Sequence, residues 1–273
     1  MEKNKIMSTS FQYDKDASDR LLAMYLTSDM VDQRNRILQA LSLHHGDRIL
    51  DVGSGPGILA SAMGEAVGES GWVCGIDISE PLISMAKAYC AHQPWVDFRY
   101  GDATKIPLPD GYFDIVISTQ VLEYLSDISV ALAELYRVLR PGGSAVILDT
   151  DWDSIVWHTG DPVRMNRILD VWDEHVANPH LPKTLARNLR EAGFQIETQQ
   201  IIPVFNPVFD PNTFSNRLID LMVSFVSDRK GVTQNEAVAW AQELRQLGEK
   251  QEYFFSLNRY LFLAKKPQVN AQH

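Results

Sequence analysis

The most informative part of the chain is the stretch Arg48-Ile-Leu-Asp-Val-Gly-Ser-Gly-Pro-Gly-Ile58. Its first half is a short apolar run, which predicts a strand, and apolar residues recur at helical spacing from Ile58 onward. Glycines at 53, 55 and 57 lie between the two, so the stretch predicts a strand, a tight loop and a helix. Gly53 permits a sharp exit from the strand, and the missing side chain of Gly55 lets a ligand approach the backbone. The following helix offers free N–H groups and a positive dipole end.

Two kinds of ligand-binding protein use such a loop. Dinucleotide-binding enzymes carry G-x-G-x-x-G and place a pyrophosphate on the helix N-terminus. Here the third glycine, Gly57, comes one position early, and Ile58 stands where the dinucleotide pattern has glycine. The observed form is D-x-G-x-G-x-G and begins at Asp51. A strand-to-helix turn that binds no ligand is the remaining alternative, because glycines also serve packing.

A second apolar strand, Trp72-Val-Cys-Gly-Ile-Asp77, ends in an acid. The Asp77 carboxylate can accept hydrogen bonds from both hydroxyls of a ribose, which is the role of an acid about 20 residues after the glycine loop. The alternative is that Asp77 only solvates a strand end. Two more strands are predicted, one ending in Gly101-Asp102-Ala103 and one from Phe113 into Thr119-Gln120.

These motifs, with Leu139-Arg-Pro-Gly-Gly143 before a further strand, resemble those of class I S-adenosylmethionine (SAM) methyltransferases. Residues 46–150 are most similar to the methyltransferase type 11 group, which includes ubiquinone and menaquinone biosynthesis methyltransferases. The resemblance implies SAM as the cofactor and S-adenosylhomocysteine as its product. The cofactor-binding residues that it implies are Asp51, Gly53, Ser54, Gly55, Asp77, Ile78, Asp102, Ala103 and Gln120.

The predicted fold class is α/β, with a Rossmann-like seven-stranded sheet that is mostly parallel and has an antiparallel last strand. We expect a SAM-binding core over 46–203 plus 252–266, an N-terminal helical cap over 1–45, and a helical lid insertion over 204–251. The insertion carries one apolar helical stripe, which favours core packing. If it is instead a lid over an apolar pocket, Phe214, Met222 and Phe225 touch the substrate.

Methyl transfer from SAM needs alignment and exclusion of water more than a dedicated catalytic residue. The weak candidate for a general base is His158, which follows the fifth predicted strand on the rim where substrate should bind. The alternative is a solvated loop histidine. Trp152 and Trp157 are candidates for the floor of the substrate pocket. The acids of 149–153 alternate on a predicted loop and more often cap helices than bind metal, so no metal site is predicted.

The composition excludes several classes of function. Net charge is −10, from 25 Lys and Arg against 35 Asp and Glu, which disfavours a phosphate-binding surface for nucleic acid. The chain has two cysteines, no apolar run of about 18 residues and no secretory signal pattern. We therefore expect a cytoplasmic protein without a membrane span. The oligomeric state is unknown from the sequence.

The function expected from the sequence is SAM-dependent methylation of O, N or C on a small, partly apolar metabolite. Two alternatives remain at this point. One is an NAD-dependent oxidoreductase on a similar sheet, against which the glycine spacing argues. The other is a non-catalytic SAM-binding regulatory protein. The sequence does not identify the substrate, the methylated atom or the pathway.

Overall fold

A computed structural model describes residues 15–268. The first 14 residues of the predicted N-terminal cap lie outside this range. The core of the molecule is one seven-stranded sheet with the order β3-β2-β1-β4-β5-β7-β6. The strands are β1 (Arg48–Val52), β2 (Trp72–Asp77), β3 (Val96–Tyr100), β4 (Phe113–Thr119), β5 (Leu139–Trp157), β6 (Gln195–Asn206) and β7 (Phe255–Lys265). Strands β1 to β5 are parallel and β7 is antiparallel to both of its neighbours, so the predicted fold class is confirmed.

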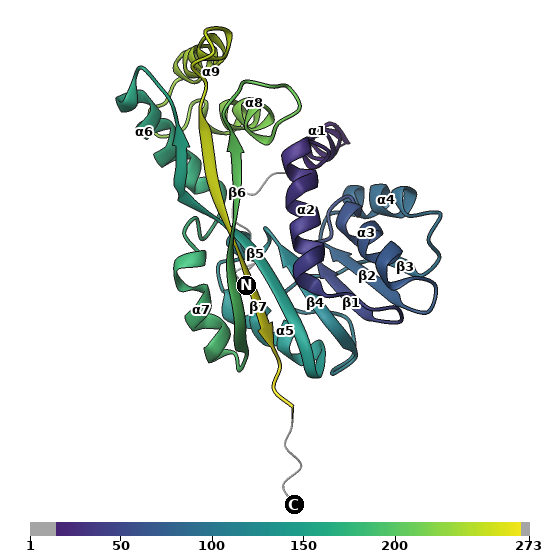
Figure 1. The fold of residues 1–273 in the computed structure, drawn as a ribbon. Coiled ribbons are helices and arrows are strands. Elements are labelled where there is room, and N and C mark those ends of the chain that lie inside the picture. The colour runs from purple at the N-terminus through teal and green to yellow at the C-terminus, as the bar shows by residue number, and fades with distance from the viewer. Residues whose placement is uncertain (1–14, 269–273) are drawn as a thin grey trace, which may run out of the picture.

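Helices cover both faces of this sheet (Figure 1). One face is covered by α2 (Ser28–Leu41), α3 (Ile58–Val67) and α4 (Glu80–Tyr89). The other is covered by α5 (Ile128–Val138) and α7 (Pro182–Glu191). Burial on both faces explains why β1, β2 and β4 are nearly continuous apolar runs rather than alternating ones.

The strands β5, β6 and β7 extend past the others and carry a second layer of helices (Figure 1). We call this part, residues 152–176 and 204–257, the cap lobe. Its helices are α6 (Pro162–Trp172), α8 (Phe214–Val226) and α9 (Gln234–Glu249). The predicted insertion between the last two strands therefore holds two helices. At the start of α9, Thr233 Oγ1 accepts the N–H of Glu236 at 3.2 Å.

The N-terminal helices α1 (Lys15–Tyr25) and α2 lie between the cap lobe and the rest of the sheet (Figure 1). Helix α2 buries Met30, Gln33, Ile37 and Leu41, which form one stripe along the helix. The lower half of this stripe packs on the sheet, and Met30 reaches the core of the cap lobe. The two helices thereby close the carboxyl ends of β1 and β4, where ligands of such sheets bind.

Candidate functional site

The loop after β1 has three glycines in the left-handed region, with φ of 72° at Gly53, 51° at Gly55 and 80° at Gly57. A Cβ at Gly53 would lie 2.2 Å from a methyl of Val121, and one at Gly57 would lie 2.8 Å from the Cβ of Ala86. Within residues 15–268, a Cβ at Gly55 would meet only the Tyr25 ring, at 4.0 Å. Two of the three glycines therefore serve packing, and Gly55 alone among them keeps the loop open to a ligand.

Asp77 at the end of β2 organises this loop. One carboxylate oxygen accepts the N–H of Gly55 and the other accepts the N–H of Ser79, both at 2.9 Å. Burial raises the pKa of Asp77, and the backbone N–H groups oppose that rise. Sequence reasoning placed Asp77 at the ribose but missed its bond to the loop. Each oxygen keeps further lone pairs, so the carboxylate can still accept from ligand hydroxyls.

An open cavity lies over the loop. Its lining includes the predicted residues Asp51, Gly53, Ser54, Gly55 and Gln120. It also includes residues of α1 and α2 that sequence reasoning missed, because the sequence of a helix does not indicate which loop the helix will cover. These are Tyr25, Met30, Gln33, Arg34 and Ile37.

Asp51 is buried at the floor of this cavity, with 1% of its surface exposed. Burial, and then the negative charge of Asp77, raise the pKa of Asp51 to about 7. Gln120 stands at the opposite wall with φ of 56°, and its N–H donates to Leu148 O at 2.6 Å. A non-glycine residue in the left-handed region is uncommon and occurs most often at functional positions.

The other predicted cofactor residues follow β2 and β3 and do not line the cavity. Ile78 is 52% exposed, and Ala103 is buried. The carboxylate of Asp102 accepts from the N–H and the hydroxyl of Thr104, at 2.8 and 2.7 Å. These three residues lie at the expected end of the sheet, and their contact with the cofactor stays a prediction.

Next to the cavity is a group of buried polar side chains that sequence reasoning missed. We call Gln33, Glu123, Asp149 and Arg259 the polar centre. Glu123 accepts the N–H of Thr150 at 3.2 Å, and Asp149 accepts the N–H of Glu123 at 3.4 Å. Burial raises the pKa of both carboxyls, and the positive charge of Arg259 opposes that rise at Glu123.

The predicted substrate-pocket residues are buried in the core of the cap lobe, and none of them lines the cavity. Two of them border the polar centre: the Arg259 guanidinium lies 4.6 Å from the centre of the Phe214 ring, and the Trp152 indole lowers the pKa of Glu123. Contact with substrate stays a prediction for the whole set. Its members are Trp152, Trp157, Phe214, Met222 and Phe225.

The expected position of His158 is wrong. Strand β5 does not end near Leu148 but continues to Trp157, because the first residues of β7 pair with it. His158 is therefore exposed at the far end of the cap lobe, where its N–H donates to Phe254 O at 3.0 Å. The residue does not lie on the rim beside the glycine loop.

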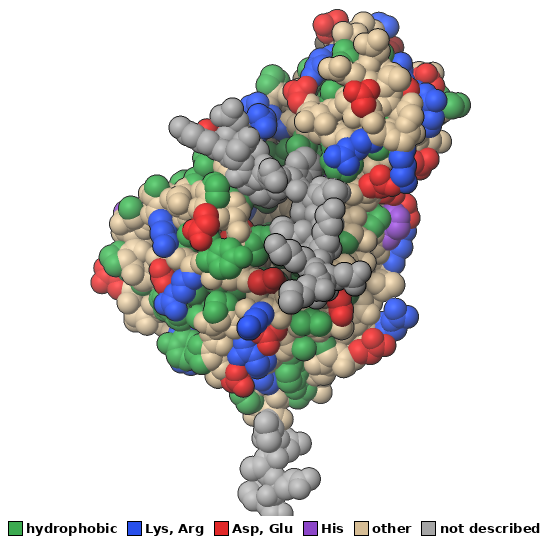
Figure 2. Space-filling model, turned by 180° about the vertical axis from the view of Figure 1, so that it is seen from behind, with side chains coloured by type: hydrophobic (Ala, Val, Ile, Leu, Met, Phe, Trp, Pro, Cys, Tyr) green, Lys and Arg blue, Asp and Glu red, His purple; other side chains and the backbone are tan. Residues whose placement is uncertain are grey.

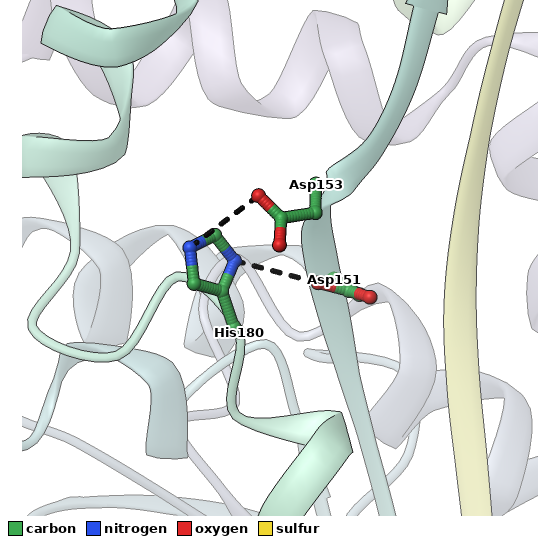
Figure 3. A group of neighbouring side chains, drawn as sticks. All are labelled: Asp151, Asp153 and His180. Atoms are coloured by element: carbon green, nitrogen blue, oxygen red, sulfur yellow. Dashed lines mark ion pairs between the residues drawn. The ribbon is translucent and has the colours of Figure 1, made fainter.

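Two of the three acids in residues 149–153 lie within ion-pair distance of a histidine. Figure 3 shows His180 between Asp151 and Asp153, with N–O distances of 3.4 and 3.5 Å. This geometry could hold a metal ion. However, the ammonium of Lys183 also contacts both carboxylates, so the negative charges already have cationic partners. That the chain uses no metal stays a prediction.

The sheet order, the antiparallel β7 and the glycine loop after β1 define a class I SAM-dependent methyltransferase fold. A candidate methyltransferase of Bacillus halodurans C-125 superposes with a TM-score of 0.64 at 21% identity, covering 87% of this chain and 100% of that one. Phosphoethanolamine N-methyltransferase 2 of Haemonchus contortus, solved with S-adenosyl-L-methionine, gives 0.61 at 19% identity, covering 94% and 58%.

The sequence comparisons agree with this fold. Residues 50–147 match the family model of a methyltransferase domain, methyltransferase type 11. Demethylmenaquinone methyltransferase of Staphylococcus aureus is 38% identical over 117 residues, which cover 43% of this chain and 48% of the relative. The chain spans about half the length of the curated relatives it matches.

Proposed function

We propose that this chain transfers the methyl group of SAM to O, N or C of a small acceptor molecule. One observation carries the proposal: Asp77 fixes Gly55, and Gly55, at the wall of a cavity, is the loop glycine that the described residues pack against least. A turn used only for packing has no reason to leave that position open. The match of residues 50–147 to a methyltransferase domain supports the same conclusion.

SAM supplies an already activated methyl group when it is bound. The chain then has to bind it, orient the acceptor and exclude water. The loop N–H groups and the N-terminus of α3 suit the polar end of the cofactor, and Asp77 suits its ribose. Tyr25 and the other residues of α1 and α2 cover the cavity and keep solvent from the reacting atoms.

A small acceptor is favoured over a macromolecule. The face in Figure 2 mixes acidic and basic side chains and does not gather lysines and arginines into one patch, and net charge is −10. A nucleic-acid substrate would need such a patch. None of the helices within residues 15–268 is long and apolar enough to cross a membrane.

The test is calorimetry followed by turnover. We expect S-adenosylhomocysteine to bind with micromolar affinity and NAD not to bind. Incubation with methyl-labelled SAM and fractionated metabolites should then move label into a small molecule, and Asp77→Ala should slow this transfer at low SAM concentration. Binding of NAD without S-adenosylhomocysteine would overturn the cofactor assignment, and tight S-adenosylhomocysteine binding without any transfer would leave a regulatory protein.

A further inference from the structure

Arg259 is a charged residue in a core position of β7. It interrupts the buried alternation Phe255, Leu257, Leu261, and only 1% of its surface is exposed. Its two hydrogen bonds in the described part of the chain both run from Nη1, to Met30 Sδ at 3.0 Å and to Gln33 Oε1. Gln33 likewise interrupts the apolar stripe of α2. Both polar residues therefore stand where packing alone would select an apolar side chain.

The guanidinium has no acid bound to it. Among the side chains that the structure describes, no carboxylate oxygen forms an ion pair with it at up to 4.0 Å. Glu123 exerts the strongest attraction on it, but Glu123 Oε2 accepts the N–H of Thr150, and Oε1 makes no hydrogen bond with the guanidinium. Burying a guanidinium without a bound acid costs several kcal/mol, so the position is hard to explain by stability.

The Nε atom of the guanidinium lacks a hydrogen-bond partner among the described residues. Nε is buried, Nη1 is occupied by α2, and one face of the group lies on Phe214. The Nε side of an arginine presents two parallel N–H groups, which match the two oxygens of a carboxylate. Both side chains bound to Nη1, Met30 and Gln33, line the cavity over the glycine loop. Arg259 does not itself line the cavity, but it lies directly behind these two lining residues.

We propose that Arg259 anchors the methyl acceptor, and that the acceptor is a small carboxylic acid held by its carboxylate on the Nε edge. This inference rests on the proposed methyltransferase function. Because one cavity joins Met30 and Gln33 to Gly55 and Gln120, an acid anchored at Arg259 extends toward the cofactor loop. The anchored end fixes the orientation of the other end, which carries the atom that receives the methyl group.

The test uses the full chain saturated with S-adenosylhomocysteine, whose binding is measured first by calorimetry. Failure at that stage contradicts the methyltransferase function and not the anchor. Melting temperature is then measured at constant ionic strength with formate, acetate, benzoate or inorganic phosphate in place of chloride. The proteins are wild type, Arg259→Met, Arg259→Lys and, as a control, Arg99→Met, whose guanidinium pairs with Asp97 at the surface.

We expect at least one carboxylic acid to raise the melting temperature of wild type and Arg99→Met by roughly 5–10 °C at about 100 times its Kd. Arg259→Met should lose this shift, and Arg259→Lys should keep part of it. Without any acid, Arg259→Met should melt at or above the wild-type temperature, because an unpaired buried charge has been removed.

Three results would overturn the proposal. The first is an equal response of wild type and Arg259→Met, which places acid binding elsewhere. The second is no response of wild type to any acid, or a response to phosphate alone, which excludes a carboxylate anchor. The third is a large fall in the melting temperature of both Arg259→Met and Arg259→Lys without acid, which makes the guanidinium a structural counter-ion of Glu123.

Discussion

Two neighbouring glycines in the loop after β1 should respond in opposite ways to the same substitution. Gly55 and Gly57 both have positive φ, so alanine is strained by about 1–2 kcal/mol at either position. The space around them differs. A Cβ at Gly57 would lie 2.8 Å from Ala86 Cβ and 2.9 Å from Phe98 Cζ. One at Gly55 would have, in the described part of the chain, only the Tyr25 ring at 4.0 Å.

The magnitudes follow from these contacts. Gly57→Ala adds overpacking of about 1–3 kcal/mol to the strain and should lower the melting temperature by roughly 5–15 °C. Gly55→Ala carries the strain alone and should lower it by about 5 °C. The new methyl of Gly55→Ala occupies ligand space instead, so affinity for S-adenosylhomocysteine should fall about 10- to 100-fold. The folded Gly57→Ala protein should bind within about threefold of wild type.

The assay is calorimetry for the affinity and differential scanning fluorimetry for the melting temperature, on both variants side by side. Each variant is the control for the other, since strain from positive φ is common to both. If Gly55→Ala bound S-adenosylhomocysteine as tightly as wild type, the cofactor would not approach the loop at Gly55. The central observation behind the proposed function would then be lost.

Three further predictions concern charged groups. Asp77→Ala should weaken SAM binding by about 1.5–3 kcal/mol. It should also lower the free energy of unfolding, because the Gly55 and Ser79 N–H groups lose their acceptor. An unchanged Kd for SAM by calorimetry would show that Asp77 is not part of the cofactor site. Burial raises the pKa of Asp51 from 3.8 to about 7, so the stability this group contributes is present at low pH and lost as pH rises through about 7. Urea unfolding at about pH 5 and pH 8 should show a smaller loss for Asp51→Asn than for wild type, and equal losses would contradict the assignment. EDTA should leave methyl transfer unchanged, because Lys183 already neutralises the acids near His180; activity lost with EDTA and restored by Mn²⁺ would show a metal requirement.

The elements that the sequence predicted well are those whose signals are local. The glycines at 53, 55 and 57 report backbone conformations that other residues rarely adopt, and the structure has positive φ at all three. Buried parallel strands give continuous apolar runs, so β1, β2 and β4 could be placed within a residue or two. Asp77 follows from its position at the end of such a strand.

The end of β5 could not be predicted in this way. Residues 149–157 mix acids with tryptophans, and the pairing of β5 with β7 is interrupted between Asp151 and Val156. The strand continues because β7 extends equally far and pairs with it, and β7 is paired in turn with β6. This pairing is set by tertiary structure and leaves no local signal in the sequence. The misplaced His158 and the placement of Trp152 and Trp157 in a packed core both follow from that extension.

The residues of the polar centre were missed for a different reason. The sequence does contain a signal for them, which is a polar residue at a buried position of an apolar pattern. Arg259 stands at an inward position of the β7 alternation, and Gln33 stands on the buried stripe of α2. A polar residue in a core position is informative, whereas an exposed apolar one is not. Reading each apolar stripe for its exceptions would have selected both residues without a structure.

The same extension of β5 and β7 explains how a residue in the middle of a strand comes to lie behind the wall of a candidate ligand site. Arg259 pairs with Thr150 of β5, and Leu261, two residues on, pairs with Leu148, whose partner in β4 is Thr119, the last residue of that strand. Arg259 therefore lies one step beyond the end of β4, at the edge where parallel sheets bind their ligands. Because neighbouring residues of a strand face opposite ways, moving β7 by one residue would turn Arg259 away from α2. A one-residue insertion between 255 and 258 that preserved folding should therefore remove the response to carboxylic acids while leaving the cofactor loop intact.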